Sequence, residues 1–357
     1  MGYRHQLVTQ LANTVRTVFL LVVLGLVVWP GSALSHNARS LYNESLVSIQ
    51  NGNLDSAKRT LRQALTDFPR FAEAHHLLGI VLFKESPSNP QAITELERAI
   101  ELHPNFAQAY YDLGLVFVHQ NKLDKAKQRF QQALEVYPHF WQAQLSLAKV
   151  YDQTHSTEEA THGYKNVLRI NPSQEEALYN LAYIYEQEEN SEEAKALLSQ
   201  LTQTNEHHAD AWYLLGRIAE RENNFSDAIS FYQQAIEVNP DHLEAHYNLG
   251  YLYQYQGQAP SAIEQFQIVT RLDPSHAEAR LNLAVLLASN DQLDEAEQEY
   301  RQVLNLNPNL VEAYYNFGVF YEFHKKDTDR ALIQYRKYLE LGGKDERIQQ
   351  LVEKVSQ

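Results

Sequence analysis

The 357-residue sequence contains no cysteine, and its only methionine is the first residue. The lack of thiols excludes disulfides, thiolate zinc sites, iron–sulfur clusters, thiol nucleophiles and a lipid-modified N-terminal cysteine. Basic residues are also scarce, since 30 Lys and Arg stand against 45 Asp and Glu, for a formal net charge of −15. Phosphate contacts need clustered cations, so we expect no nucleic-acid partner.

The N-terminal segment, residues 1–37, lacks acidic residues and differs from the rest of the sequence. Arg4 and Arg16 precede or flank an unbroken apolar run at residues 18–29, and small residues follow up to Ser35. This pattern is typical of a signal peptide, although the apolar region is just long enough for an uncleaved signal anchor. Either alternative places the later residues outside the cytoplasm, in a periplasm or, in a photosynthetic source, a thylakoid lumen. An uncleaved segment would also associate the protein with the membrane.

The remaining sequence repeats with a period of about 34 residues, which indicates an array of one structural unit. Prolines follow this period, with one double gap, at Pro69, Pro104, Pro138, Pro172, Pro240, Pro274 and Pro308. Alanines follow it at Ala57, Ala92, Ala126, Ala160, Ala194, Ala228, Ala262, Ala296 and Ala331. Glu206 stands where the double gap lacks a proline, and we predict a softer joint there.

One unit is enough to predict the local structure. Ala245, Leu249 and Leu252 have the spacing of a helix face, and Gly257 then interrupts the pattern. A second amphipathic segment follows over residues 260–272. Each unit is therefore predicted to be a pair of antiparallel helices, and the fold class to be all-α.

The best-matching unit resembles the tetratricopeptide repeat, a family with a 34-residue consensus. Its matching residues are Tyr110, Leu113, Gly114, Phe117, Ala126, Phe130, Ala133 and Pro138. The resemblance implies a right-handed solenoid of about nine helix-turn-helix repeats, followed by a short capping helix at residues 346–357. The predicted repeats are 38–71, 72–106, 107–140, 141–174, 175–208, 209–242, 243–276, 277–310 and 311–345.

The repeats occupy residues 38–345 and leave no segment of this sequence for a separate catalytic domain. No phosphate-binding loop, nucleophile elbow or zinc-protease motif is present in the sequence. We therefore expect a protein that is not an enzyme and that needs no cofactor. A repeat solenoid offers an extended surface in place of a closed active site.

Histidine is the residue type that most needs weighing, because there are 15 of them. His242 and His246 have the i, i+4 spacing that places two imidazoles on one helix face. His208, His242 and His276 also recur in register before predicted first helices. Neighbouring repeats lie roughly 10 Å apart, so this row cannot share one metal ion. His246 occupies the bulky position that Trp212 fills elsewhere, and we favour packing over a metal site.

In the tetratricopeptide family the first helices line a concave groove that holds the ligand, so the resemblance directs attention to their polar positions. One position carries asparagine in five units, with Asp112 in another: Asn43, Asn180, Asn248, Asn282 and Asn316. An asparagine amide both donates to and accepts from a peptide backbone. The row resembles the asparagine ladder of the O-linked N-acetylglucosamine transferase repeats. The alternative is that asparagine is only a tolerated polar residue there.

Two further positions of the first helices belong to the predicted groove. Tyrosines precede the asparagine position at Tyr42, Tyr111, Tyr179, Tyr213, Tyr247 and Tyr315. They suit a binding surface, and equally suit packing between repeats. Acidic residues stand three positions earlier at Glu73, Glu176, Asp210, Glu244, Glu278 and Glu312. Some relatives use basic residues near here to clamp a carboxylate, so the reversed charge favours an extended neutral or basic partner segment.

These observations favour a non-enzymatic protein–protein interaction scaffold outside the cytoplasm. Family habit and the N-terminal segment suggest a role in assembly or maturation of a membrane or envelope complex. Two alternatives stay open at this point. Tyrosine and asparagine also suit a carbohydrate or cell-wall ligand, and histidine with acidic clusters suits a metal-delivery protein.

Overall fold

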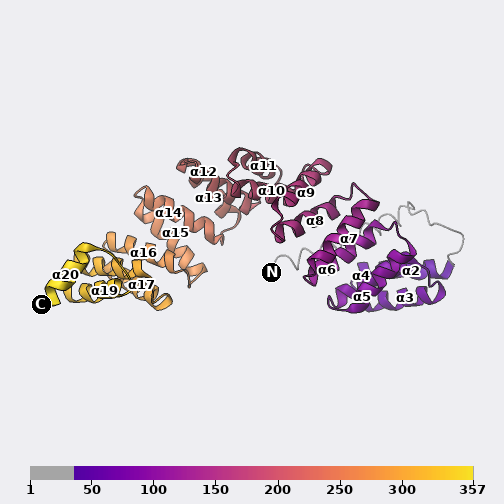
Figure 1. The fold of residues 1–357 in the computed structure, drawn as a ribbon, viewed down its shortest axis with the longest axis horizontal. Helices are drawn as coiled ribbons and strands as arrows, with labels where there is room; N and C mark the ends of the chain where they lie inside the picture. Colours follow the sequence, from indigo (N-terminus) through magenta and orange to yellow (C-terminus); the bar gives the residue numbers. More distant parts are fainter. Residues whose placement is uncertain (1–35, 357) are drawn as a thin grey trace. The chain divides into compact units, whose positions relative to one another are not determined.

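The structure is a computed structural model that describes residues 36–356, and over these residues it contains helices and no strands (Figure 1). The predicted signal or anchor segment lies outside the described residues, except for residues 36 and 37, which begin the first helix. The helices are α2 (His36–Gln50), α3 (Leu54–Asp67), α4 (Ala72–Glu85), α5 (Pro90–Leu102), α6 (Ala107–His119), α7 (Leu123–Val136), α8 (Trp141–Gln153), α9 (Thr157–Ile170), α10 (Glu175–Gln187), α11 (Ser191–Thr204), α12 (Ala209–Arg221), α13 (Phe225–Val238), α14 (Leu243–Tyr255), α15 (Ala259–Leu272), α16 (Ala277–Ser289), α17 (Leu293–Leu306), α18 (Val311–Val319), η1 (Phe320–His324), α19 (Thr328–Glu340) and α20 (Glu346–Ser356).

Helices α2 to α19 form nine successive pairs, in which a first helix is followed by an antiparallel second helix. Second helices also contact the first helix of the next pair, as α3 contacts α4 and α13 contacts α14. The predicted all-α fold, with its repeated helix pairs and a short helix α20 after the last pair, is confirmed. Among residues 36–356, no helix combines the length and apolar character needed to cross a bilayer.

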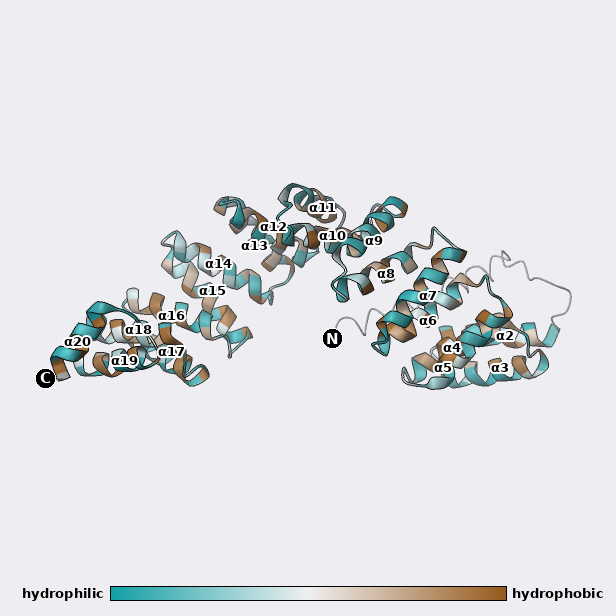
Figure 2. Cartoon of the chain, viewed as in Figure 1, coloured by the Kyte–Doolittle hydropathy of each residue, from teal (hydrophilic) through white to brown (hydrophobic). Residues whose placement is uncertain are grey.

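The contacts divide the chain into two compact units, one ending at Ile184 and one beginning at Tyr185, so that the division falls within α10. The core of the first unit includes Phe71, Phe117 and Phe130. In the second unit, the pairs from α15 onward bury Phe266 and Tyr335. Figure 2 shows the corresponding amphipathic helices, with apolar residues along one side and polar residues along the other.

Close helix contact explains why small residues recur in the first helices. A Cβ atom added to Gly114 would lie 2.5 Å from the Phe130 ring of the paired helix. The same clash would arise between Gly216 and the ring of Tyr232, also at 2.5 Å. Protein interiors are packed at crystal-like density, so these positions exclude larger side chains.

A hydrogen bond links the start of many first helices to the loop before them. The bulky residue of the first turn donates to the carbonyl of the proline position, as in Trp212 Nε1 to Glu206 O at 2.9 Å and Tyr314 Oη to Pro308 O at 3.1 Å. The Nε2 of His246 lies 3.0 Å from the Pro240 carbonyl in the same way. These contacts give a partner to the polar atom of a side chain whose other atoms pack in the interior.

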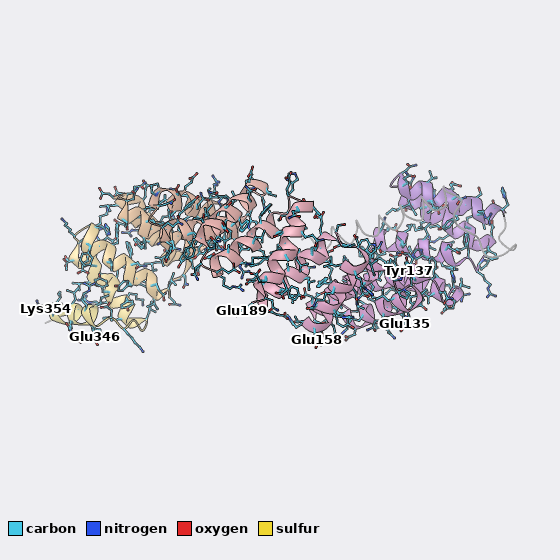
Figure 3. The ribbon with its side chains drawn as sticks, turned by 90° about the horizontal axis from the view of Figure 1, so that it is seen from above. Glu135, Tyr137, Glu158, Glu189, Glu346 and Lys354 are labelled. Carbon is cyan, nitrogen blue, oxygen red and sulfur yellow. The ribbon has the colours of Figure 1, made fainter. Side chains whose placement is uncertain are left out.

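The turn inside each pair follows one backbone pattern. One residue there adopts positive φ in most pairs, including Gly257 at 71° and Glu189 at 62°, the latter labelled in Figure 3. In the last pair, α18 continues into the π-helical turn η1, which accommodates one extra residue before α19. Single-turn π-bulges are the usual way in which a helix absorbs such an insertion.

Candidate functional site

The candidate site is the face formed by the first helices, and in the second unit it carries a row of exposed acidic side chains. The row stands in the first turn of α12, α14, α16 and α18 and comprises Asp210, Glu244, Glu278 and Glu312. The side chains of Asp210, Glu244 and Glu278 are 64%, 63% and 67% exposed. Of the predicted acidic positions, these are the ones that stay open to a partner.

The predicted tyrosine position serves mainly to pack successive repeats. The ring of Tyr111 is 3% exposed and lies 5.0 Å from the ring of Phe140, which directly precedes α8 of the next helix pair. The rings of Tyr213 and His242 have the same relation, with their centroids 4.9 Å apart. Tyr247 is partly buried in an equivalent contact with the next histidine. Their rings therefore present less surface to a partner than the sequence analysis predicted.

The remaining predicted tyrosines are also engaged with other rings. Tyr179 stacks on Tyr183, one turn further along α10, at a centroid distance of 6.5 Å. Tyr315 meets Tyr338 of the paired helix at 5.5 Å. Both are partly buried, so a partner would reach only one side of each ring.

The three histidines in register are helix caps, a role that the sequence analysis missed. His208, His242 and His276 each stand directly before a first helix, and each Nδ1 accepts from a backbone N–H three residues later, at 3.2 to 3.3 Å. Their recurrence at a helix start, where capping side chains belong, was the available signal. Since Nδ1 accepts, Nε2 carries the proton in the neutral ring.

The cap of His242 is tied to the acidic row. Its Nε2 lies 3.4 Å from Asp210 Oδ1, and Glu244 Oε2 lies 3.4 Å from its Nδ1. Hydrogen bonding to His242 is the main cause that holds the pKa of Asp210 below its ordinary value. Asp210 is therefore kept ionised beside the buried imidazole of His242.

The predicted asparagines divide into two groups. Asn248 Nδ2 donates to the Tyr232 hydroxyl at 3.1 Å, and hydrogen bonding from Asn282 acts against the rise in pKa that burial causes in Tyr247. By contrast, three side chains make no hydrogen bond to any described residue: Asn43, Asn180 and Asn316. The first group of the predicted asparagines thus bonds neighbouring tyrosines, and the second group stays available to bind a partner.

Tyrosines further along the first helices are more accessible than the predicted ones. Tyr251 and Tyr255 of α14 are 50% and 66% exposed, and Tyr183 of α10 is 43% exposed. They follow the predicted tyrosine position by one or two helical turns and so lie on the same helix face. Spacing of four from Tyr179 and Tyr247 was the signal for them in the sequence.

The pair considered for metal binding is occupied by protein contacts. His246 is 3% exposed, with Nδ1 2.7 Å from Gln265 Oε1 and Nε2 3.0 Å from the Pro240 carbonyl. His242 serves as a cap. Among the residues that the structure describes, no group of three or more histidine, aspartate or glutamate side chains is arranged to hold a metal ion.

Basic side chains on this face of the second unit are neutralised locally. Glu186 is fully buried, and Arg217 and Arg221 both pair with its carboxylate. Arg221 Nη1 also donates to the Glu186 carbonyl at 2.9 Å. A buried carboxylate needs such partners, so these arginines have a structural reason to be present.

Comparison with protein families finds matches to models of tetratricopeptide repeat proteins over most of the chain. Residues 42–86 and 254–317 match models of the tetratricopeptide repeat, and residues 88–121 match a TPR repeat model. Residues 107–280 match the tetratricopeptide repeat protein 21 C-terminal ARM domain. No curated protein matches the chain significantly.

Three solved structures of similar fold share 13% to 24% sequence identity with this chain. The C-terminal part of a TPR repeat-containing protein from Cytophaga hutchinsonii is 13% identical, with a TM-score of 0.57, covering 68% of this chain and 99% of that one. PilF of Pseudomonas aeruginosa is 23% identical, with a TM-score of 0.52 and coverage of 62% and 97%. YrrB, described as a TPR protein with an unusual peptide-binding site, is 24% identical, with a TM-score of 0.46 and coverage of 52% and 96%. The repeated helix pairs, their small residues and the matched segments lead to one conclusion: the chain is a member of the tetratricopeptide repeat family.

Proposed function

We propose that this protein is a non-enzymatic scaffold whose first helices hold an extended, basic segment of a partner protein. The observation that carries the proposal is the acidic row of the second unit, which presents one exposed carboxylate per repeat at Asp210, Glu244, Glu278 and Glu312. Extended chains present side chains at regular intervals, so a row with a regular repeat suits such a ligand. Complementary charge would select basic segments and speed their association.

Tyrosines beside the row supply the apolar part of the proposed surface. Tyr251 and Tyr255 are exposed on α14, the helix that also carries Glu244. Tyrosine offers apolar area with a polar tip and loses little conformational entropy on binding. A segment that combines basic and apolar residues therefore fits this face better than a purely charged one.

The proposal includes a location outside the cytoplasm and a role in assembly or maturation of a membrane or envelope complex. Its support is the basic and apolar sequence of residues 1–37 together with the habits of the family. Protease treatment of intact and permeabilised cells tests the location. Digestion of the repeats only after the inner membrane is opened would contradict it.

Charge reversal tests the binding surface. The probes are two fluorescein-labelled nine-residue peptides, one alternating lysine with serine and one alternating glutamate with serine. We expect the full-length protein to bind the basic peptide only. The triple variant Glu244→Lys, Glu278→Lys and Glu312→Lys should weaken this binding about 3- to 100-fold, because exposed ion pairs are individually weak.

A matched variant separates the row from overall charge. Glu237→Lys, Glu264→Lys and Glu295→Lys change the same net charge, but these residues are exposed on the second helices α13, α15 and α17. We expect this variant to bind nearly as tightly as the unmodified protein in 0.15 M salt, where distant charges are screened. Equal weakening by both triple variants would show that the first-helix face has no special role.

A further inference from the structure

A cavity of about 390 Å³ opens in the first unit, among α8, α9 and α10. The residues that line it are Lys149, Asp152, Gln153, Tyr164, Glu176 and Asn180. Lys149 and Glu176 form an ion pair with each other. The side chains of Asp152, Gln153 and Asn180 make no hydrogen bond or ion pair with any residue between 36 and 356. One carboxylate and two amides thus surround the cavity without a protein partner.

The same positions recur two repeats later, where they are joined to one another. Glu220, Tyr232 and Asn248 each follow Asp152, Tyr164 and Asn180 by 68 residues. There the Tyr232 hydroxyl donates to Glu220 Oε2 at 2.6 Å and accepts from Asn248 Nδ2 at 3.1 Å. Aspartate is one methylene shorter than glutamate. In the first unit, the shorter Asp152 side chain makes no hydrogen bond with the Tyr164 hydroxyl.

The last repeat shows what can occupy this arrangement. Glu322 and Tyr335 hold the equivalent acidic and tyrosine positions, and the Tyr335 hydroxyl donates to Glu322 Oε2. Arg347, from α20, donates through Nη1 to both Glu322 oxygens, at 2.9 and 3.1 Å. Its Nη2 lies 3.4 Å from the Tyr335 hydroxyl, and the guanidinium carbon lies 5.7 Å from the centre of the Tyr335 ring. A guanidinium group therefore fits beside this acid and tyrosine within the protein itself.

Charge distinguishes the cavity from the last repeat. Glu176 occupies the position that Arg347 holds after the last repeat, and its charge is already balanced by Lys149. Asp152 is thus the acidic group of the cavity without a cation. Burial is the main cause that raises the pKa of Asp152, and the nearby His155 acts in the opposite direction. Asp152 is itself an exposed residue, so a cation that enters the site can reach its carboxylate.

We propose that this cavity receives an arginine side chain of the partner segment, with Asp152 binding its guanidinium and the amide oxygens of Gln153 and Asn180 accepting from its remaining N–H groups. The inference rests on the proposed function, since it takes an extended partner on the first helices. Arginine suits the site better than lysine because its planar group carries five donors in a fixed arrangement. The cavity would thereby fix the register of a segment bound along the first helices of the first unit.

The test compares two probes of nearly equal shape on the full-length protein. They are acetyl-Gly-Gly-Arg-Gly-Gly-amide and the same peptide with citrulline, which lacks the charge, and saturation-transfer NMR reports their weak binding. We expect the arginine peptide to bind about tenfold or more tightly than the citrulline peptide, as a charge-assisted hydrogen bond predicts. Asp152→Asn should remove this preference.

A second variant separates shape from charge. Asp152→Glu keeps the negative charge, and the geometry of Glu220 and Tyr232 predicts that the longer side chain will bond Tyr164. We expect Asp152→Glu to keep the arginine preference, because Glu322 binds Arg347 while it also bonds Tyr335. Glu158→Gln is the control, because it removes an exposed charge on α9, labelled in Figure 3, and should bind like the unmodified protein.

Each outcome decides the inference. Equal binding of the two peptides, or an undiminished preference in Asp152→Asn, would show that the cavity does not hold a guanidinium. Binding of the lysine–serine peptide that depends on the acidic row would then still support the scaffold. Failure of that peptide as well would overturn the proposed function together with the inference.

Discussion

The two units differ in the residue that stands directly before each first helix. The first unit has Phe71, Phe106 and Phe140 at this position, and the second has His208, His242 and His276. All of them are rings at the junction between two helix pairs, and ring contacts with the preceding first helix are made by Phe71, Phe106, Phe140, His242 and His276. The histidine side chains also accept a hydrogen bond from the helix that they precede.

The difference teaches that one position can stabilise a repeat junction in two ways. Phenylalanine buries apolar area at the junction. Histidine buries less apolar area, but it caps the helix and makes a polar contact with the acidic row. The rule has exceptions at the unit ends. Gln174 caps α10 with its side chain, and Leu310 makes no cap bond. The acidic surface and the capped junctions therefore coincide in the second unit.

The largest expected effect comes from removing an apolar junction ring. Phe140→Ala deletes a ring that is 7% exposed and packs on Tyr111, and should cost about 3–5 kcal/mol. Hydrogen exchange in α8 measures it locally, since repeat arrays do not always unfold as one unit. Tyr137→Ala is the control, because Tyr137 is 53% exposed beside the same ring (Figure 3). Similar losses in both variants would contradict the packing role.

A capping exchange sharpens the comparison. His242→Phe gives the second unit the residue type of the first, keeps a ring against Tyr213 and removes the hydrogen bond to Ala245 N. We expect a loss of about 0.5–2 kcal/mol, measured by hydrogen exchange in α14. His242→Asn keeps an acceptor but loses the ring. If His242→Phe costs nothing, stacking alone stabilises this junction.

The prolines before the first helices give a smaller effect. The first unit has proline at each of these joints, whereas the second has Glu206 in place of one. Glu206→Pro should add about 0.4–1 kcal/mol, because the preceding Asn205 is already extended at φ −141° and ψ 90°. Slower hydrogen exchange in α12 would support this prediction. Glu206→Ala, which removes the charge only, should change little, and equal stabilisation by both would implicate the charge instead.

The smallest effect depends on pH. The lowered pKa of Asp210 means that its contribution to folding stability is present above the ordinary value of 3.8 and is lost as the pH falls through the lowered value. Asp210→Asn should therefore lower the melting temperature slightly at pH 7, and this difference should shrink below about pH 4. Asp241→Asn, an exposed change nearby, is the control. A difference that grows in acid would contradict the assignment.

The fold was predictable because its signals are local and repeated. Gly114, Ala126 and Pro138 report helix contact and helix ends within one unit, so their spacing was sufficient. The extra residue near Lys325 could be predicted from the sequence. Its place in a π-helical turn could not, because a longer loop and a helix bulge both add one residue to the sequence. Backbone geometry was needed to distinguish them.

The site was less predictable because it depends on pairs across repeats. Tyr213 meets His242, 29 residues later, and a period of 34 gives no sign of that contact. The sequence therefore left the tyrosine position open between binding surface and packing, and contacts such as that of Tyr213 with His242 show that packing is its main role. The cavity beside Asp152 was equally hidden, since an aspartate and a glutamate at the same repeat position both count simply as an acidic residue. Their difference of one methylene matters only against a fixed tyrosine ring.

Helix α20 has a consequence for self-association. Ile348 is fully buried against the last repeat, and Arg347 binds the carboxylate of Glu322. An uncovered helix pair would present an apolar face and an acid to any molecule with a matching first helix, including another copy. Head-to-tail contacts of that kind grow into filaments when they do not close into a ring. By covering both the apolar and the charged part of this face, α20 removes a surface that a second copy could otherwise bind.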